Sequence, residues 1–314
     1  MFDAKNFVEE AIFKLKKEIK GKAIIAVSGG VDSTVAAYLT WRAIRERLLP
    51  VFIDTGLIRK DEDLYVRKVF SEMGMEVKVI NKKADFLSAL KGVVDPERKR
   101  SIVGERFIRA FEEEAKNFWA EYLVQGTIAP DWIESGGGIR DRIKTHHNVG
   151  GIPENTKLKI VEPLRDLYKD EVRVVARYLS LPVAERQPFP GPGLSVRIIG
   201  EVTEEKLNTL RNVTEIVENE IEAAVERGEI KKPWQYFAIL LPVRTTGVHG
   251  DNRVYGETVA LRVIESIDGM TGTYSQLTHS LLEKISLRIT NEVPKINRVV
   301  YDITNKPPST IEWE

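Results

Sequence analysis

An apolar run that ends in paired glycines and continues as a helical pattern is the strongest constraint on how this chain folds. Residues 23–27 are apolar, 28–30 read Ser-Gly-Gly, and apolar side chains recur at helical spacing across 35–43. This order predicts a strand, a tight loop and a helix. Further short apolar runs alternate with helical segments, and they lie at 51–54, 77–80 and 122–125. We therefore predict an α/β fold with a parallel, doubly wound sheet.

The loop between the first strand and the first helix after it has the composition of a phosphate-binding loop. Two adjacent glycines let the backbone approach a ligand, so that N–H groups and the positive end of the helix dipole face an anion. The loop lacks the lysine of the common nucleoside-triphosphate loop and has an aspartate instead. Hydroxyls, amides and a carboxylate suit a magnesium-bound pyrophosphate. The alternative is a turn whose glycines serve geometry alone. The candidate phosphate-binding residues here are Ser28, Gly29, Gly30, Val31, Asp32, Ser33 and Thr34.

Two irregular segments divide the rest of the chain. Residues 135–157 are rich in glycine and show no amphipathic period, which is typical of a functional lid or a disordered segment. The run Gln-Pro-Phe-Pro-Gly-Pro-Gly at 187–193 is the clearest composition break. We therefore expect one domain over 1–186 and a second over 187–314.

The second domain shows a different order of elements. We expect a β-α-β-β-α-β arrangement with a mixed or antiparallel sheet and helices on one face, a two-layer α+β domain. The predicted elements are a strand at 194–199, a helix capped by Thr203 and ending near Arg227, strands at 237–242 and 258–267, a helix at 275–292 and a strand at 296–303.

Composition excludes several classes of function. The 47 basic and 47 acidic residues balance, so no general attraction to nucleic acid or to an acidic membrane surface is expected. The absence of cysteine excludes disulfides, thiolate metal sites and a cysteine nucleophile from this chain. No apolar run approaches the roughly 20 residues of a membrane span, and the start of the sequence does not resemble a secretory signal. We expect a cytoplasmic protein.

The SGGVDS hexapeptide at 28–33 resembles the loop of the N-type ATP pyrophosphatases, which have an adenine nucleotide alpha-hydrolase-like fold. Within that superfamily the chain resembles GMP synthetase from about Gly21 to its last residue. The segments that carry this likeness are APDWIES at 129–135, KTHHNVGG at 144–151, RQPFPGPGL at 186–194, GVHGDNRVY at 247–255 and KPPSTIEWE at 306–314. One departure is Gln187, where the family often has histidine.

The resemblance implies a ligase that adenylates XMP with ATP and then lets ammonia displace AMP to form GMP. ATP would be the co-substrate with Mg²⁺, and Asp32 would help to place the metal, although it could instead cap the helix. The family pattern also assigns Gly126 and Asp131 to ATP binding. In the lid, Lys144 would stabilise charge on the α-phosphate, and His146 and His147 would order the closed lid. The alternatives are a solvated surface lysine and a metal-binding histidine pair, although no third ligand with zinc-like spacing accompanies the histidines.

The resemblance further implies an XMP site built largely from the end of the sequence. A lysine, an arginine and hydroxyl groups suit a phosphate monoester, and a glutamate can accept hydrogen bonds from xanthine N–H groups. The residues assigned to XMP in this way are Arg100, Asp251, Lys306, Thr310, Ile311 and Glu312.

The missing cysteine also bears on the source of ammonia. Many GMP synthetases carry a glutamine amidotransferase domain with a cysteine nucleophile, so we expect a separate amidotransferase subunit to supply ammonia here. The second domain resembles the dimerisation domain of the family, which implies a homodimer. NAD synthetase is the nearest alternative enzyme, but it has no counterpart of the second domain. A tRNA thiolase would need cysteine and a basic surface, and a silent regulatory protein would not need the intact loop, Lys144 and tail.

Overall fold

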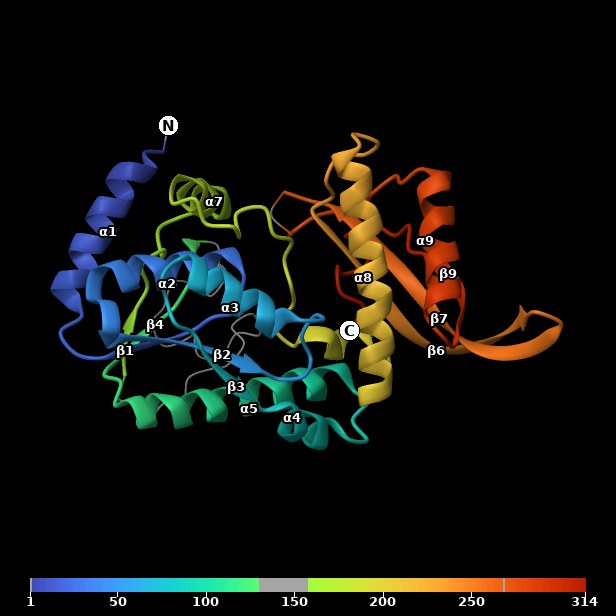
Figure 1. The fold of residues 1–314 in the computed structure, drawn as a ribbon, viewed down its shortest axis with the longest axis horizontal. Helices are drawn as coiled ribbons and strands as arrows, with labels where there is room; N and C mark the ends of the chain where they lie inside the picture. Colours follow the sequence, from blue (N-terminus) through green and yellow to red (C-terminus); the bar gives the residue numbers. More distant parts are fainter. Residues whose placement is uncertain (1, 130–157, 268) are drawn as a thin grey trace. The chain divides into compact units, whose positions relative to one another are not determined.

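The computed structural model describes residues 2–129, 158–267 and 269–314 (Figure 1). The chain forms two compact units. Unit 1 consists of Met1–Gly56, Asp61–Phe86 and Val103–Arg186, and unit 2 consists of Leu57–Lys60, Leu87–Ile102 and Gln187–Glu314. Unit 2 therefore takes in two short segments from the first third of the sequence as well as everything after residue 186.

Unit 1 contains a five-stranded parallel sheet with the strand order β3-β2-β1-β4-β5. The strands are β1 (Ala23–Ala26), β2 (Leu48–Asp54), β3 (Lys78–Asn81), β4 (Tyr122–Val124) and β5 (Lys159–Val161). The central strand β1 is apolar throughout, because helices cover both faces of a parallel sheet and its side chains are therefore largely buried. Ile24 of β1 pairs with Leu49 of β2 on one side and with Leu123 of β4 on the other.

Helices cover both faces of this sheet, which confirms the predicted doubly wound α/β fold. Helices α2 and α3 connect neighbouring strands on one face, and α5 lies on the other (Figure 1). The helices are α1 (Ala4–Glu18), α2 (Val31–Ile44), α3 (Glu62–Glu72), α4 (Lys83–Leu90), α5 (Pro96–Phe118) and α7 (Lys169–Tyr178), with a 3₁₀ turn η1 (Arg45–Arg47) before β2. The residues of α4 and α5 are shared between the two units.

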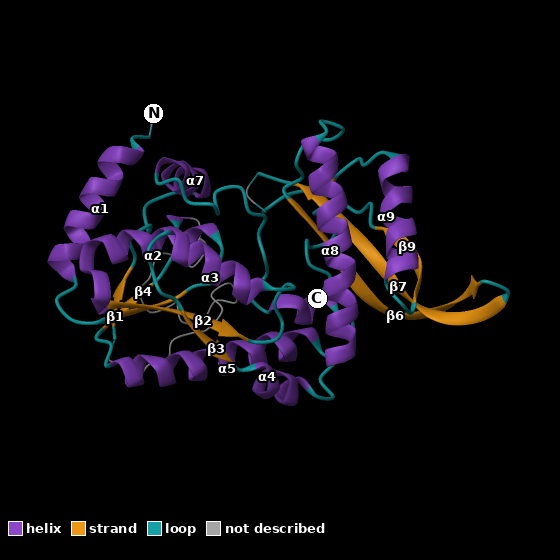
Figure 2. Ribbon diagram, viewed as in Figure 1, coloured by secondary structure: helices purple, strands orange, loops and turns teal. Residues whose placement is uncertain are grey.

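Unit 2 is a mixed sheet with two long helices. Strands β6 (Gln235–His249), β7 (Asn252–Glu265) and β8 (Thr273–Tyr274) are antiparallel neighbours, and β9 (Ile296–Tyr301) pairs with β7 in parallel. Helix α8 (Glu204–Glu226) packs on β6, α9 (His279–Glu292) packs on β9, and the two helices pack on each other (Figure 2). Thr203 caps α8 by accepting a hydrogen bond from the Lys206 N–H, as predicted. The predicted α+β class is confirmed.

The first predicted strand of this unit is wrong. Residues 193–197 form a 3₁₀ helix, η3 (Gly193–Arg197), and only Ile198 makes an isolated bridge, to Leu240. Gly193 has φ +65°, and its N–H donates to the Pro190 carbonyl, so the chain turns where the prediction had it extended. A short apolar run buried on all sides has no period that separates a strand from a buried turn.

Several other boundaries differ from the sequence prediction. Helix α9 begins at His279 and not at Ser275, because the Thr278 hydroxyl caps it by accepting from the Leu281 N–H. Strand β9 ends at Tyr301, two residues early. Strands β6 and β7 continue to a turn at 250–251, because residues beyond Leu241 pair through their main chains although few of them are buried.

Within the parts of the chain that the structure describes, no helix is both long and apolar enough to cross a membrane.

Candidate functional site

The predicted phosphate loop, residues 28–33, lies at the carboxyl end of β1, the central strand of unit 1. Strand β1 has β2 on one side and β4 on the other, and the chain winds outward in both directions from it. This is the topological switch point of the sheet, where open α/β sheets bind ligands. The loop joins Ala26 to Val31, the first residue of α2.

The loop directs main-chain donors outward. Gly29 has φ +73°, a conformation that strains residues with a side chain. Gly30 is the N-cap of α2 and, as a glycine, has no side chain with which to cap that helix. The Ser28 hydroxyl lies 3.3 Å from the Gly30 N–H and 3.3 Å from the Ser33 hydroxyl. Amides, two hydroxyls and the positive end of a 14-residue helix therefore meet at one point, which suits an anion.

Gly126, which follows β4, closes one side of this loop. A Cβ atom at Gly126 would lie 3.1 Å from the main-chain carbon of Asp32 and 3.1 Å from the nitrogen of Ser33. A larger residue here would push against the first turn of α2. The glycine therefore lets the end of β4 approach the phosphate loop closely.

Asp32 lies in the first turn of α2 and uses one carboxylate oxygen within the protein. Its Oδ2 accepts from Nζ of Lys169, the first residue of α7. Its Oδ1 is buried and has no hydrogen-bond partner among the described residues. The Thr34 hydroxyl in the same turn is fully buried and also has no partner there. Lys169, which no sequence motif indicated, thus adds a cation to the loop.

The surroundings of Asp32 fit a magnesium ion carried by phosphates. Mg²⁺ is usually held by one or two carboxylates together with substrate phosphates and water. Asp32 supplies one uncommitted carboxylate oxygen, and the described residues contain no group of three or more acidic or histidine side chains that could hold a metal by themselves. Asp32 would therefore hold the ion and the phosphates would supply most of its ligands.

The end of the sequence forms a second cluster of predicted site residues, in unit 2. Glu312 is paired with Arg197 at 2.7 Å, Ile311 packs against the core around Phe237, and the Thr310 hydroxyl donates to the Glu312 carbonyl. Lys306 Nζ donates to the Gly269 carbonyl at 2.8 Å. Arg100 donates to the main-chain oxygen of Glu314. Four of the six residues assigned to XMP thus lie in the tail. A fifth, Arg100, contacts the tail through its side chain.

Three buried cations hold this tail, and none of them belongs to the predicted site residues. Arg262 of β7 donates to the Thr304 and Thr310 carbonyls at 2.5 and 3.0 Å, and Arg197 pairs with Glu312. Lys99 of α5 contacts the Glu314 carboxylate. Burial lowers the pKa of the Lys99 amine, and the Glu314 carboxylate opposes this shift.

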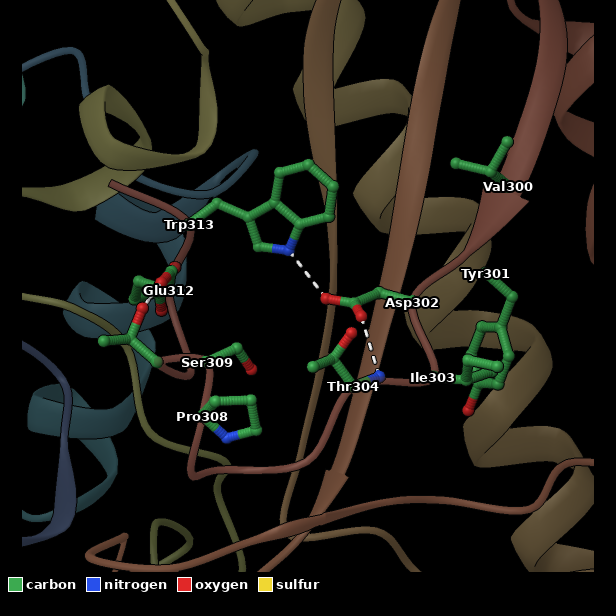
Figure 3. Close-up of a pocket in the computed structure, with 10 residues that line it drawn as sticks. Val300, Tyr301, Asp302, Ile303, Thr304, Pro308, Ser309, Glu312 and Trp313 are labelled. Carbon is green, nitrogen blue, oxygen red and sulfur yellow. Dashed lines mark hydrogen bonds between the residues drawn. The ribbon is translucent and has the colours of Figure 1, made fainter.

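The tail also forms one wall of a surface pocket of about 630 Å³ (Figure 3). The Trp313 indole donates to Asp302 Oδ2 at 2.9 Å, and Asp302 Oδ1 accepts from the Thr304 N–H at 2.9 Å. Thr310 and Glu312 line the same pocket, beside the apolar Val300 and Ile303. The lining combines an aromatic ring, carboxylates and hydroxyls, groups that can bind a purine base.

Asp251 is exposed at the turn that joins β6 to β7. Asp131, Lys144, His146 and His147 lie outside the described residues.

Comparisons with known proteins find relatives that match this chain along nearly its whole length. The family described as GMP synthase C terminal domain matches residues 219–313, and the family described as NAD synthase matches residues 3–110. A protein of Thermoplasma acidophilum, named as a subunit of glutamine-hydrolyzing GMP synthase, is 59% identical over 98% of this chain and 99% of its own length. A Methanopyrus kandleri protein of the same name is 56% identical over 100% of both chains. Among solved structures, an NMN synthetase from Francisella tularensis is similar with a TM-score of 0.48 and 15% identity, covering 68% of this chain and 87% of that one.

Proposed function

Because the chain belongs to this family of GMP synthase subunits, we propose that it converts XMP to GMP with ATP and ammonia. The enzyme is an ATP-dependent ligase that forms a carbon–nitrogen bond. An adenyl-XMP intermediate forms first, with release of pyrophosphate, and ammonia then displaces AMP. The relatives match nearly the whole chain, whereas the NAD synthase family matches only residues 3–110, so NAD synthetase is not favoured.

The arrangement of the 28–33 loop is the observation that supports this chemistry most directly. In adenylation, the 2-oxygen of XMP attacks the α-phosphorus of ATP and pyrophosphate departs. Negative charge builds on the departing group, and donors fixed in advance stabilise it at little reorganisation cost. The Gly30 amide, the Ser28 and Ser33 hydroxyls and the Lys169 ammonium are such donors. We assign the pyrophosphate of ATP to this loop.

Magnesium would reduce the repulsion between the phosphates and the loop's own carboxylate. We assign Asp32 to this ion because its Oδ1 is buried and has no hydrogen-bond partner within the described residues. Lys169 holds the other oxygen and so fixes the direction of the carboxylate. Gly126 then serves ATP binding by letting β4 approach the loop.

The tail of unit 2 is our candidate for XMP binding. Lys306 would neutralise the phosphate of XMP, and Thr310 would donate to it. Arg197 already engages both oxygens of Glu312, so Glu312 would meet the xanthine N–H groups through its remaining lone pairs. Arg100 keeps further N–H groups besides the one that contacts Glu314. The role of Asp251, which is exposed on the hairpin, rests on family resemblance alone.

The remaining parts of the proposal rest on resemblance and on the names of the relatives. Lys144 would act on the α-phosphate, with His146 and His147 ordering the lid and Asp131 contacting ATP. A separate glutamine amidotransferase subunit would supply ammonia, since the relatives are named as one subunit of a glutamine-hydrolyzing enzyme. We further propose a homodimer formed through unit 2, and a cytoplasmic location.

One assay tests the proposed function. The purified chain is incubated with XMP, ATP, magnesium and ammonium chloride, and GMP, AMP and pyrophosphate are quantified. We expect the three products in equal amounts and none when XMP is left out. If ATP is cleaved without XMP, or if GMP never forms, the proposed function is wrong.

A further inference from the structure

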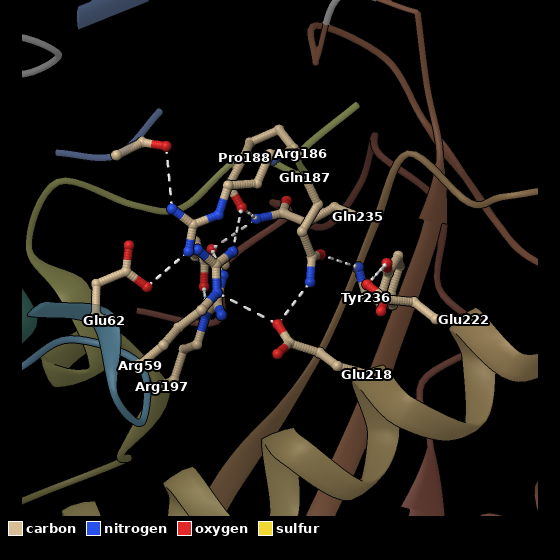
Figure 4. Close-up of polar contacts among 12 residues, drawn as sticks. Arg59, Glu62, Arg186, Gln187, Pro188, Arg197, Glu218, Glu222, Gln235 and Tyr236 are labelled. Carbon is tan, nitrogen blue, oxygen red and sulfur yellow. Dashed lines mark hydrogen bonds and ion pairs between the residues drawn. The ribbon is translucent and has the colours of Figure 1, made fainter. Parts of the chain in front are cut away.

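Arg186 is the last residue of unit 1, and it contacts the phosphate loop. Its Nη1 donates to the Gly29 carbonyl at 3.0 Å, and its Nη2 pairs with Glu62 Oε2 at 2.7 Å (Figure 4). The guanidinium lies 4.0 Å from the centre of the Tyr65 ring. Its side chain is only 17% exposed. A carboxylate, an aromatic ring and a carbonyl therefore hold one planar group in place.

The contact with the Gly29 carbonyl determines the direction of the next amide. In a planar trans peptide, the carbonyl of one residue and the N–H of the following residue point in opposite directions. With the Gly29 oxygen on Arg186, the Gly30 N–H must point the other way. It does so, towards the Ser28 hydroxyl at 3.3 Å, which is the side to which we assign the phosphates.

Without a partner for its carbonyl, this peptide could turn over. Glycines flank it on both sides, and glycine has access to both signs of φ. A reversed peptide would aim the Gly29 oxygen at the phosphates and remove the Gly30 donor. A Cβ at Gly29 would lie 2.7 Å from Arg186 Nη1, so the close approach of the arginine also needs glycine there.

We propose that Arg186 is a positioning residue of the phosphate loop, which holds the Gly29–Gly30 peptide with its N–H towards the departing pyrophosphate. The inference rests on the proposed function, because it assumes that the loop binds phosphates. Glu62 neutralises the guanidinium, so Arg186 acts through the peptide it holds and not through direct attraction of the anion. Arginine suits this role because its fork can serve two acceptors in fixed directions, which a lysine ammonium cannot.

The test uses the full-length chain with Arg186→Lys and Arg186→Met. For Arg186→Lys we expect the KM for ATP to rise roughly ten- to a hundredfold, the range of one hydrogen bond to a charged group, while the KM for XMP stays unchanged. Calorimetry with inorganic pyrophosphate and magnesium should show a loss of affinity of the same size. Arg177→Lys is the matched control, because Arg177 forms an arginine–carboxylate pair with Glu185 in the same unit and is exposed. This control substitution should leave the KM for ATP and the affinity for pyrophosphate unchanged.

The outcomes separate the inference from the proposed function. If Arg186 were merely structural, both variants would unfold at lower temperature and lose active enzyme, with the KM for ATP and the pyrophosphate affinity unchanged in the folded fraction. That result would overturn the inference. If Arg186→Met does not fold, the measurements on Arg186→Lys alone decide the test. If the wild-type chain itself fails to bind pyrophosphate or to form GMP, the proposed function fails instead.

Discussion

Arg197 donates to both carboxylate oxygens of Glu312, from Nε to Oε2 at 2.9 Å and from Nη2 to Oε1 at 2.7 Å. The guanidinium also lies 3.8 Å from the centre of the Phe237 ring. The arginine is almost completely buried, so this pair has little competition from water. A bidentate pair of this kind fixes the position of the tail on which the proposed XMP site depends.

Loss of the Glu312 charge should destabilise unit 2. We expect Glu312→Gln to lower the free energy of unfolding by about 2 kcal/mol, because a buried guanidinium keeps only a neutral partner. Thermal unfolding followed by circular dichroism measures this change. Glu229→Gln, which breaks the exposed pair with Arg227, is the control and should change little. Equal effects of the two substitutions would show that the buried pair does not hold the tail.

The proposed XMP phosphate contact can be tested at Lys306. Lys306→Met should raise the KM for XMP at least roughly tenfold, the effect of losing a charged hydrogen bond, and leave the KM for ATP unchanged. Steady-state kinetics with each substrate varied in turn measures this split. Lys295→Met, at an exposed lysine paired with Glu205 in the same unit, is the control. An unchanged KM for XMP would remove Lys306 from the site.

Point substitutions are preferable to removal of the tail. Deletion of residues 306–314 would leave the buried Arg197 and Lys99 without the carboxylates that they contact. The unit would then lose stability for reasons unrelated to XMP.

Lys144 should act on turnover and not on stability. If its ammonium stabilises charge on the α-phosphate, Lys144→Ala should lower kcat by roughly a hundredfold or more. The unfolding temperature should change no more than it does for an ordinary surface substitution. Lys157→Ala, at the end of the same glycine-rich segment, is the control. Near-normal turnover of Lys144→Ala would exclude the role.

The nitrogen source gives a fourth prediction. The chain contains no cysteine, so it has no thiolate to attack the amide of glutamine. Ammonium chloride should support GMP formation by the purified chain, and glutamine alone should not. Addition of a glutamine amidotransferase subunit should restore glutamine use. Efficient synthesis from glutamine by the chain on its own would contradict the proposed division of labour.

Tyr236 should make unit 2 sensitive to alkaline pH. Burial raises the pKa of its phenol above the ordinary value of 10.0, and the Glu222 carboxylate, which accepts from the hydroxyl at 2.9 Å, raises it further. Above pH 10 the unfolded chain releases this proton more readily than the folded chain, so stability falls as the pH rises. The decline of the unfolding temperature above pH 10 should be less steep in Tyr236→Phe. Tyr255→Phe, at an exposed position of β7, should leave the profile as it is.

The features that the sequence determined by itself are local ones. The strand, loop and helix around the SGGVDS loop follow from an apolar run, paired glycines and a helical period within about twenty residues. The doubly wound sheet follows from the repetition of such units, and the Thr203 cap of α8 from one hydroxyl at the start of a helical pattern. Neighbours along the chain decide each of these features, so their signal survives without tertiary structure.

Tertiary structure alone decided which side chains complete the sites. Lys169 pairs with Asp32 across 137 positions of the sequence, Arg186 reaches Gly29 across 157, and Arg197 reaches Glu312 across 115. Such pairs produce no periodic pattern or motif in the sequence, because a single charged residue is normally interpreted as solvent-exposed. The 3₁₀ turn at 193–197 and the full length of the β6–β7 hairpin also emerged only from the fold. The turn depends on burial on every side, and the length of the hairpin depends on main-chain pairing between its two strands. Neither produces a pattern in the local sequence.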